Sequence, residues 1–481
     1  MKLILTSIIS LTIGFNCIAQ NKNNKSIDAL KNETATTIQS GYDAYKKIAL
    51  SIWDYAELGY KENKSSALLQ NTLKDNGFTV EAGVAGMPTA FLATYGSGSP
   101  VIGILAEYDA LPGISQDNSP TKTPIANKNS AHACGHHLFG TGSVASGIAI
   151  KKLLEAGKIK GTIKVFGCPA EEGGSGKVYM VRDGLFNSVD IVLHWHAWDN
   201  NLVINTSALA NKSAKFRFYG IASHASASPE KGRSALDAVE AMNNMVNMMR
   251  EHVPQETRIH YAITNGGKAP NVVPEFAEVY YYVRHPDKVT AVSIFDRIVK
   301  AAEGAAVGTE TKMDYEIIGG THDLLINKTL AINMQSNLEK VGGVNYTAEE
   351  MDYAKKIQTS FSGKFPSIDN AGTITPLHID KAQGSTDVGD VSYAVPTVGV
   401  ETATWVPGTS AHSWQAAACG GTDIGIKGMI VASKTMAFTA IDLFTTPALI
   451  KKAKEEFVQS IGDYQYKALL GDRKPALNYR D

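Results

Sequence analysis

Short apolar runs and helical patterns alternate along the first part of the chain. The apolar runs are predicted to be buried strands, at 101–105, 161–167 and 190–193. Helical spacing of hydrophobic residues predicts helices around them, at 27–58, 65–76 and 141–156. Strands that alternate with helices indicate an α/β domain, in which a doubly wound or mixed sheet carries helices on both faces.

The pattern changes at about residue 211. Strands are predicted at 213–219, 259–263, 276–283 and 313–318, and helices at 234–252 and 291–305. The order β-α-β-β-α-β is typical of a ferredoxin-like α+β module. An apolar run at 395–400 predicts that the first domain resumes after this insertion. The predicted ranges are therefore 26–210 for the first part of the large domain, 211–325 for the insertion and 326–481 for the second part.

The helix predicted at 234–252 begins with Ser234 and Asp237, which resemble a capping box. Its hydrophobic face includes Met242 and Met249. This face either packs on the small sheet or forms the surface for a second subunit, and the pattern alone leaves both interpretations open.

The length of 481 residues is too great for one ordinary domain and agrees with this division. A hydrophobic content of 44% with 19% charged residues indicates a globular protein with an ample core. The formal net charge of −1 provides no strong field for nucleic acid, so no nucleic-acid partner is expected. No stretch after the N-terminal one is predicted to span a membrane.

The N-terminus has the pattern of a secretory signal peptide at residues 1–20. Lys2 precedes a short apolar run at 3–15, and small residues near Ala19 fit a cleavage site. We therefore expect an exported protein, in a bacterial periplasm; anchoring as a lipoprotein through Cys17 is the alternative. Without Cys17 an odd number of cysteines remains, which does not predict a disulfide framework: Cys134, Cys168 and Cys419.

The densest candidate chemistry lies at 131–140, where three histidines and Cys134 fall within six residues. Thiolate and imidazole are ligands for divalent transition metals. Gly135 allows a sharp turn between Cys134 and His136, and the helix that follows would favour a thiolate at its N-terminus. The alternative is a buried free cysteine beside histidines that pack in the core.

Further metal donors follow other predicted strands. Glu171 and Glu172 come after the strand at 161–167, His194 and His196 come after the strand at 190–193, and His412 follows the last strand. The carboxyl ends of strands in an α/β sheet meet at one edge, where ligands bind. A solvated turn is the alternative for the glutamate pair, and an ordinary loop position is the alternative for His412. Together the donors suffice for two metal ions with open positions for water.

These segments occur in the order found in one family. The chain resembles the aminoacylase/carboxypeptidase G family of dinuclear metallohydrolases, in the amidohydrolase branch that uses Cys-x-His in place of the usual bridging carboxylate. The resemblance covers nearly the whole mature chain. The segments that carry it are 106–113, 132–136, 167–174, 222–225, 232–238, 269–274, 384–392 and 412–415. The resemblance implies a mixed-sheet catalytic domain with an inserted ferredoxin-like lid that also serves dimerisation.

The resemblance also implies a role for each matching residue. Glu171 corresponds to the general base, and His224 to the histidine that stabilises the oxyanion, often in the partner subunit's site. Asn271 and Arg284 correspond to substrate-binding positions. Asp109 corresponds to an acidic residue that supports the metal ligands without binding metal itself. The implied metal ligands are Cys134, His136, Glu172, His196 and His412.

We therefore expect a metal-dependent amidohydrolase that cleaves N-acyl or N-aroyl amino acids, such as p-aminobenzoyl-glutamate. A dipeptidase with the same metals and a non-catalytic binding or partner subunit remain alternatives, although Glu171 favours catalysis. The cofactors would be two divalent ions, either manganese or zinc. A homodimer or an assembly with a related second subunit is expected. Tryptophans beside the ligands either stack on an aromatic acyl group or pack in the core: Trp195, Trp198 and Trp414.

Overall fold

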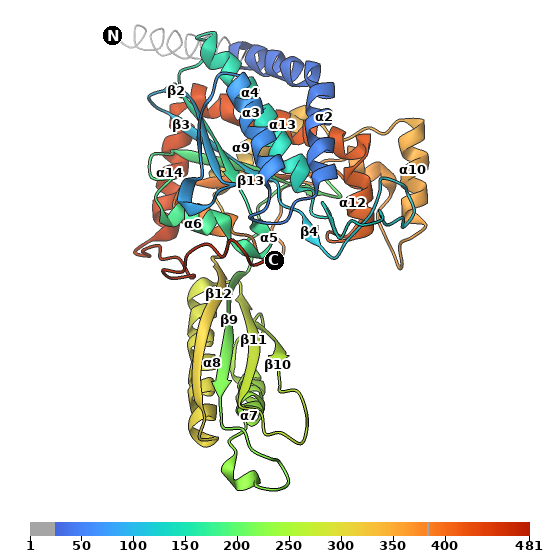
Figure 1. Ribbon diagram of the computed structural model, residues 1–481. Helices are drawn as coiled ribbons and strands as arrows, with labels where there is room; N and C mark the ends of the chain where they lie inside the picture. The colour runs from blue at the N-terminus through green and yellow to red at the C-terminus, as the bar shows by residue number, and fades with distance from the viewer. Residues whose placement is uncertain (1–24, 382–383) are drawn as a thin grey trace, which may run out of the picture.

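The computed structural model describes residues 25–381 and 384–481, which form a large domain and an elongated lid that projects from it (Figure 1). The predicted signal peptide at 1–20, with Lys2 and Cys17, lies outside the described residues. The remaining cysteines are buried free thiols in the part of the chain that is described.

The large domain is built on a mixed sheet of seven strands, in the order β1-β2-β6-β3-β7-β13-β8. Four adjacent strands, from β6 to β13, run parallel to one another, whereas the outer strands pair antiparallel. This confirms the predicted α/β class with a mixed sheet. The strands are β1 (Thr79–Ala82), β2 (Phe91–Ser97), β3 (Val101–Glu107), β6 (Gly161–Cys168), β7 (Ile191–Trp198), β8 (Leu202–Val203) and β13 (Thr397–Ala403). A separate short pair consists of β4 (Leu111–Pro112) and β5 (Ser130–Ala131).

Two apolar helices form the centre of the large domain's core. α4 (His136–Glu155) and α13 (Asp423–Thr445) pack against each other and against β7. By length and composition α13 could cross a membrane, but 89% of its apolar window is buried inside the fold, as in the core helix of a globular domain. The other helices of this domain are α2 (Tyr42–Tyr55), α3 (Asn63–Asp75), α5 (Glu171–Gly174), α6 (Gly176–Arg182), α9 (Lys328–Val341), α10 (Ala348–Gln358), α11 (Val388–Ser392), α12 (Trp414–Gly420) and α14 (Pro447–Ile461).

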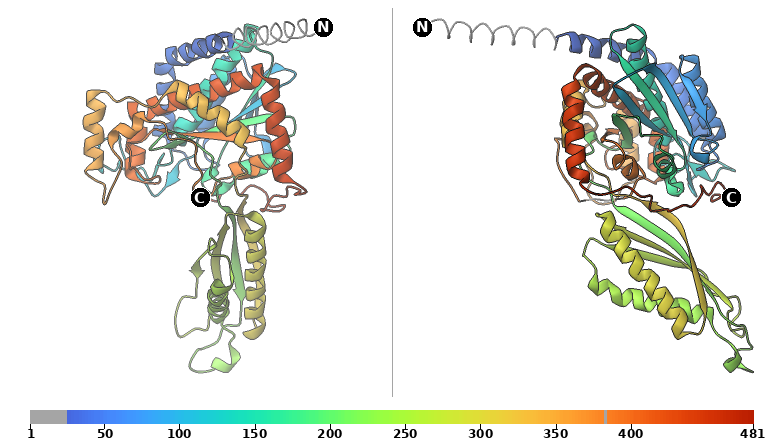
Figure 2. Two further views of the ribbon diagram at one scale, coloured as in Figure 1. Left: turned by 180° about the vertical axis from the view of Figure 1, so that it is seen from behind. Right: turned by 90° about the vertical axis from the view of Figure 1, so that its left-hand side faces the viewer.

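The lid has the predicted β-α-β-β-α-β order and a hydrophobic core of its own. Its strands form an antiparallel sheet in the order β10-β11-β9-β12, which is the ferredoxin-like arrangement. Two helices cover one face of this sheet (Figure 2). The elements are β9 (Ala210–Tyr219), α7 (Ala235–Met249), β10 (Arg258–Asn265), β11 (Phe276–His285), α8 (Lys288–Gly308) and β12 (Lys312–Thr321).

The start and the inner face of α7 follow from its sequence. The Ser234 side chain accepts a hydrogen bond from the backbone N–H of Asp237, as an N-cap does. Met242 and Val246 are fully buried in the lid core, whereas Met248 is 71% exposed. The hydrophobic face of this helix therefore packs on the small sheet, which decides between the two interpretations of its methionines.

Three predicted boundaries were wrong. The helix predicted at 27–58 is interrupted at Gly41, after which α2 begins at Tyr42. α4 begins at His136 rather than at 141, because Gly135 adopts a φ of 76° and turns the chain directly into the helix. β7 extends through Trp198, so His194 and His196 lie within the strand.

Candidate metal centre

Cys134 lies at a sharp turn between β5 and α4. A Cβ atom at Gly135 would lie 2.3 Å from the Cβ of Ala197, so only glycine permits this close approach to β7. The approach places the Cys134 Sγ 3.5 Å from the His196 Nε2. The N-terminus of α4 therefore delivers a sulfur donor next to a donor from the central sheet.

Cys134, His136 and His196 form a first donor group, whose ligating atoms all lie within 4.8 Å of one another. The other ring nitrogen of each histidine is already engaged. His136 Nδ1 lies 2.9 Å from Asp109 Oδ1, and His196 Nδ1 donates to the carbonyl of Ala197 at 2.8 Å. These contacts leave the Nε2 lone pair of both histidines available for a cation.

Cys134, Glu172 and His412 form a second donor group within the same limit. His412 Nε2 lies 3.2 Å from Glu172 Oε1. The backbone N–H of His412 donates to the Ala133 carbonyl, and the residue has a φ of 58°, which a non-glycine residue adopts only when its surroundings impose it. Because Cys134 belongs to both groups, the geometry can hold two neighbouring ions with a shared thiolate.

These residues fit divalent metal ions. Two donors that are each about 2.0–2.3 Å from one tetrahedral ion lie roughly 3.5 Å apart, and the separations of 3.5 Å and 3.2 Å are of this size. His136 Nε2 and Glu172 Oε1 are buried without a hydrogen-bond partner among the described residues. Buried polar atoms that lack partners and face one another in this way are accounted for by a bound cation.

Burial raises the pKa of the Cys134 thiol, and the neighbouring Glu172 carboxylate raises it further. In the metal-free protein this outweighs the effect expected from the N-terminus of α4, so the prediction that the helix would favour a thiolate was wrong. Binding of a divalent ion then has to displace the thiol proton, which makes metal affinity dependent on pH.

Glu171 is the first residue of α5 and stands beside both donor groups. A carboxylate oxygen of Glu171 lies within 4.8 Å of ligating atoms of Glu107 and His136. Burial raises the pKa of Glu171 well above its usual value, the carboxylates of Glu107 and Glu172 raise it further, and the ammonium of Lys177 opposes them. A carboxyl group with a raised pKa can accept and return a proton near neutral pH.

Asp109 connects the two donor groups. One carboxylate oxygen contacts His136, and the other accepts the backbone N–H of Glu172 at 2.9 Å. Asp109 is therefore in contact with one ligand of each group and belongs to neither.

A buried network that the sequence analysis missed lies behind these ligands. Lys177 Nζ lies 2.7 Å from Glu107 Oε1 and 2.6 Å from Asp387 Oδ1, and all three side chains are almost completely buried. The other oxygen of Glu107 lies 3.1 Å from His136 Nε2. Glu107 and Asp387 belong to segments that carry the family resemblance, whereas nothing in the local pattern of α6 distinguishes Lys177.

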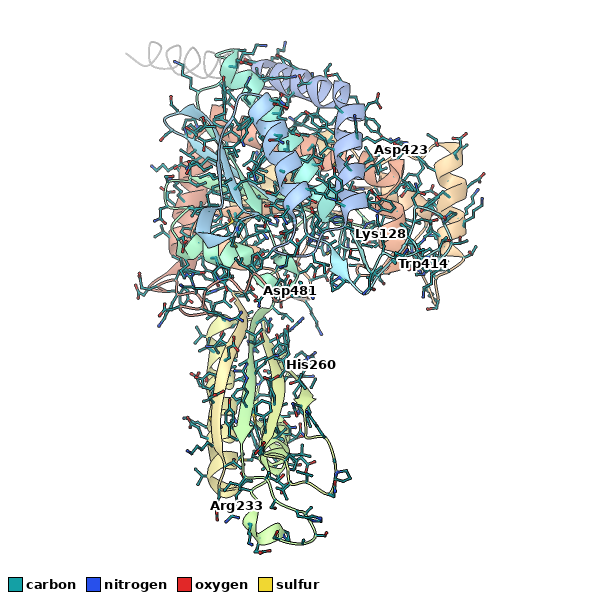
Figure 3. All side chains as sticks on the ribbon, in the orientation of Figure 1. Lys128, Arg233, His260, Trp414, Asp423 and Asp481 are labelled. Carbon is teal, nitrogen blue, oxygen red and sulfur yellow. The ribbon has the colours of Figure 1, made fainter. Side chains whose placement is uncertain are left out.

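His224 and Asn271 lie together at the distal end of the lid, both exposed. His224 forms a β-bridge with Val272, and Ala225 donates to the Asn271 carbonyl. Figure 3 marks this end of the lid by Arg233, which bridges to the same loop, far from the large domain. In one chain these residues therefore do not join the metal donors.

Arg284 lies at the opposite end of β11 from Asn271, near the hinge. At about 3.3 Å per residue, roughly 26 Å of strand separates Phe276 from Arg284. The two predicted substrate-binding residues of one chain are thus too far apart to contact the same small substrate, so their prediction as a pair within one chain was wrong.

The remaining aromatic side chains beside the ligands divide into two groups. Trp195 is fully buried and donates to the Phe139 carbonyl, so it packs in the core. His194 is buried with its pKa lowered to about 3 by burial, so its ring is neutral. Trp198 and Trp414 are half-buried, and Trp198 packs edge-on against His196, which leaves both available beside the site.

A mixed α/β domain, a ferredoxin-like lid and two donor groups that share a cysteine define a dinuclear metallohydrolase. The profile of the M20 peptidase dimerisation domain matches residues 210–310. One of the named subunits of p-aminobenzoyl-glutamate hydrolase from Escherichia coli K12 is 39% identical over 449 residues, which cover 88% of this chain and 93% of that protein. The chain therefore belongs to the M20 family, and it is an enzyme that hydrolyses amide bonds with divalent metal.

More distant relatives agree with this assignment. Human Xaa-Arg dipeptidase is 27% identical over 463 residues, which cover 92% of this chain and 94% of that protein. An aminobenzoyl-glutamate utilization protein from Klebsiella pneumoniae has a similar fold, with a TM-score of 0.59 at 17% identity, over 84% of this chain and 97% of that one. A dinuclear metal-binding M20 peptidase from Bacillus subtilis gives 0.58 at 16% identity, over 85% and 99%.

Proposed function

We propose that this enzyme cleaves the amide bond of N-acyl or N-aroyl amino acids, with p-aminobenzoyl-glutamate as the first substrate to test. The observation that carries the proposal is the position of the Glu171 carboxyl beside two metal-donor groups that share Cys134. The 39% identity to one chain of a p-aminobenzoyl-glutamate hydrolase, over most of both sequences, supports the choice of substrate.

Each step of the reaction can be assigned to residues of this chain. When bound, two divalent ions polarise the scissile carbonyl and lower the pKa of the attacking water. Glu171 takes the proton from that water and then delivers it to the leaving amine, for which its raised pKa is suited. His224 donates a hydrogen bond to the oxyanion, a contribution typically worth about 10²- to 10³-fold in rate.

The position of His224 favours a dimer. Because His224 lies at the distal end of its own lid, it reaches a metal centre only when that centre belongs to another subunit. We therefore propose a homodimer formed through the lids. A pair with a related second chain is the other arrangement, since the other named subunit of the Escherichia coli hydrolase is also similar, at 29% identity over 282 residues.

The metal is either zinc or manganese. A thiolate and three imidazoles are donors that suit zinc, whereas the acidic surroundings, which include Glu107, Glu171 and Glu172, also suit manganese. We propose that both ions support binding and that activity differs between them.

A dipeptidase is the second candidate function. Xaa-Arg dipeptidases match this chain along nearly its whole length, at 27% identity. The same metal centre and the same base would serve, because both reactions hydrolyse an amide and differ only in the groups on either side of it. A binding protein without activity would have no use for a proton acceptor at Glu171.

The experiment is hydrolysis of a substrate panel by purified protein after chelation and re-addition of manganese or zinc. The panel contains p-aminobenzoyl-glutamate, an N-acetyl amino acid, a β-alanyl dipeptide and a dipeptide with C-terminal arginine. We expect metal-dependent release of p-aminobenzoate, lost in Glu171→Gln with metal still bound. Cleavage of the dipeptides alone would favour the second function, and no cleavage by protein with two bound ions would contradict both.

We also propose export of the protein, on the evidence of the charged residue and apolar run at the N-terminus. The N-terminal residue of protein purified from cells will show cleavage near Ala19. Enzyme that keeps residues 1–20 and remains in the cytosolic fraction would contradict this proposal.

A further inference from the structure

The last segment of the chain, residues 462–481, runs along the junction between the large domain and the lid and ends beside the metal centre (Figures 1 and 2). We call it the C-terminal tail. Near its start, the Tyr464 hydroxyl lies 2.7 Å from His322 Nε2 at the hinge. Farther along, Arg473 pairs with Glu316 of β12 and donates to the Ile318 carbonyl. The tail is therefore fastened to the hinge before it reaches the site.

The end of the tail contacts the backbone of a metal ligand. The Tyr479 hydroxyl donates to the Glu172 carbonyl at 3.0 Å, and Arg480 Nη2 donates to the same oxygen at 2.5 Å. The Tyr479 ring packs edge-on against Tyr60, whose hydroxyl donates to the Gly174 carbonyl at 2.7 Å. Asp481 pairs with Lys61 at the surface, and Figure 3 shows it at the junction of the two domains.

The segment that carries Glu172 does not keep its shape by its own regular structure. Ala170 and Ser175 adopt φ values of 55° and 58°, and Glu172 itself has a ψ of 69°, outside the helical range. Non-glycine residues in this region of backbone space persist only where their surroundings impose it. The imposing contacts on Glu172 are Asp109 at its N–H and the tail at its carbonyl.

We propose that Tyr479 and Arg480 are positioning residues for Glu172, and that the tail thereby sets the affinity of the metal site formed by Cys134, Glu172 and His412. The other site, formed by Cys134, His136 and His196, receives no contact from these two residues and should keep its affinity. This inference rests on the proposed metal-dependent function.

The test is a metal titration of the full chain that resolves two dissociation constants, by chelator competition with zinc, followed by metal analysis after dialysis. The double variant Tyr479→Phe/Arg480→Ala removes both donors to Glu172. We expect one constant to weaken about 10- to 100-fold, as is usual when a residue that supports a ligand is lost, and the other to stay unchanged. Dialysed double variant should retain about one ion per chain where the wild type retains two.

Two further variants separate positioning from general stability. Asp481→Asn breaks the neighbouring surface pair without touching the Glu172 carbonyl, and it should leave both constants unchanged. Arg480→Lys keeps a donor and should recover part of the lost affinity. A lowered unfolding temperature with both constants unchanged, or an equal loss at both sites, would overturn the proposal. Wild-type protein that binds two ions but cleaves no amide would contradict only the proposed reaction, since the metal titration would still decide the role of the tail.

Discussion

The Asp109 carboxylate contacts His136 Nδ1 at 2.9 Å with one oxygen and accepts the Glu172 N–H at 2.9 Å with the other. One side chain thus orients a ligand from each of the two donor groups. The contact with His136 also fixes which ring nitrogen faces the cation, because Nδ1 must carry the proton to donate to the carboxylate.

Asp109→Asn should therefore weaken binding at both metal sites. An amide can present its oxygen to only one of the two donors, and it gives up the negative charge that favours a cation nearby. We expect about 10- to 100-fold lower affinity at each site, measured by chelator competition. Asp183→Asn, at a surface position of the same charge, should change neither constant; a full-affinity Asp109→Asn would show that the carboxylate does not orient the ligands.

Cys134 belongs to both donor groups, which makes a second prediction about stoichiometry. Cys134→Ala should abolish binding of both ions, because each group keeps only two donors. His412→Ala should abolish one ion and leave the other, since the group of Cys134, His136 and His196 remains intact. Metal content per chain after dialysis distinguishes the two variants. Retention of one ion in Cys134→Ala would mean that the thiolate is not shared.

Glu171→Gln should separate metal binding from catalysis. The amide occupies the same space, but it cannot accept a proton, so kcat should fall about 10²- to 10⁴-fold. Metal content should remain that of the wild type, because Glu171 is in neither donor group that includes Cys134. A variant that retains wild-type kcat would assign proton transfer to another group, and Glu107 would be the first to examine.

The sequence predicted the parts of the site that follow strands in regular ways. Cys134, Glu172 and His196 lie at the carboxyl ends of neighbouring strands, and that edge is where an α/β sheet gathers its ligands. The order of lid elements likewise followed from hydrophobic periodicity, because each element buries one face against its own small core.

The buried partners could not be predicted in the same way. Lys177 contacts Asp387 across more than two hundred residues, and the Tyr479 contact with Glu172 spans more than three hundred. Such contacts depend on how whole elements pack, which local patterns do not encode. The separation of Asn271 from Arg284 was missed for a related reason, since a motif gives residue types and not the position of the lid relative to the sheet.

The distal position of His224 predicts complementation between inactive variants. His224→Ala and Glu171→Gln should each be nearly inactive as homodimers. A hybrid that pairs them has one site with both wild-type groups, if His224 serves the partner's metal centre. Unfolding and refolding the two variants together should restore roughly a quarter of wild-type activity, since random pairing makes half of the dimers hybrids with one intact site each. No recovery in confirmed hybrids would place His224 outside the reaction.

Glu401 gives a prediction about stability and pH. It lies on β13 in register with His196 on β7, and burial, followed by the charge of Asp199, raises its pKa to about 8. Because the folded-state pKa is above the unfolded value, the folded protein binds the proton more tightly. The stability that this provides is complete below about pH 4.5 and is lost as the pH rises through about 8.

Glu401→Gln removes this titration, so the variant should gain stability relative to the wild type as the pH rises from 5 to 9. Each unit of pKa difference corresponds to about 1.4 kcal/mol of unfolding free energy. The measurement is the unfolding midpoint of metal-free protein across this pH range, with the exposed substitution Glu81→Gln as a control that should follow the wild type. A constant difference between Glu401→Gln and wild type at every pH would show that the carboxyl group has an ordinary pKa in the folded state. It would then be solvated, and the region between His196 and Asp199 would be open to water.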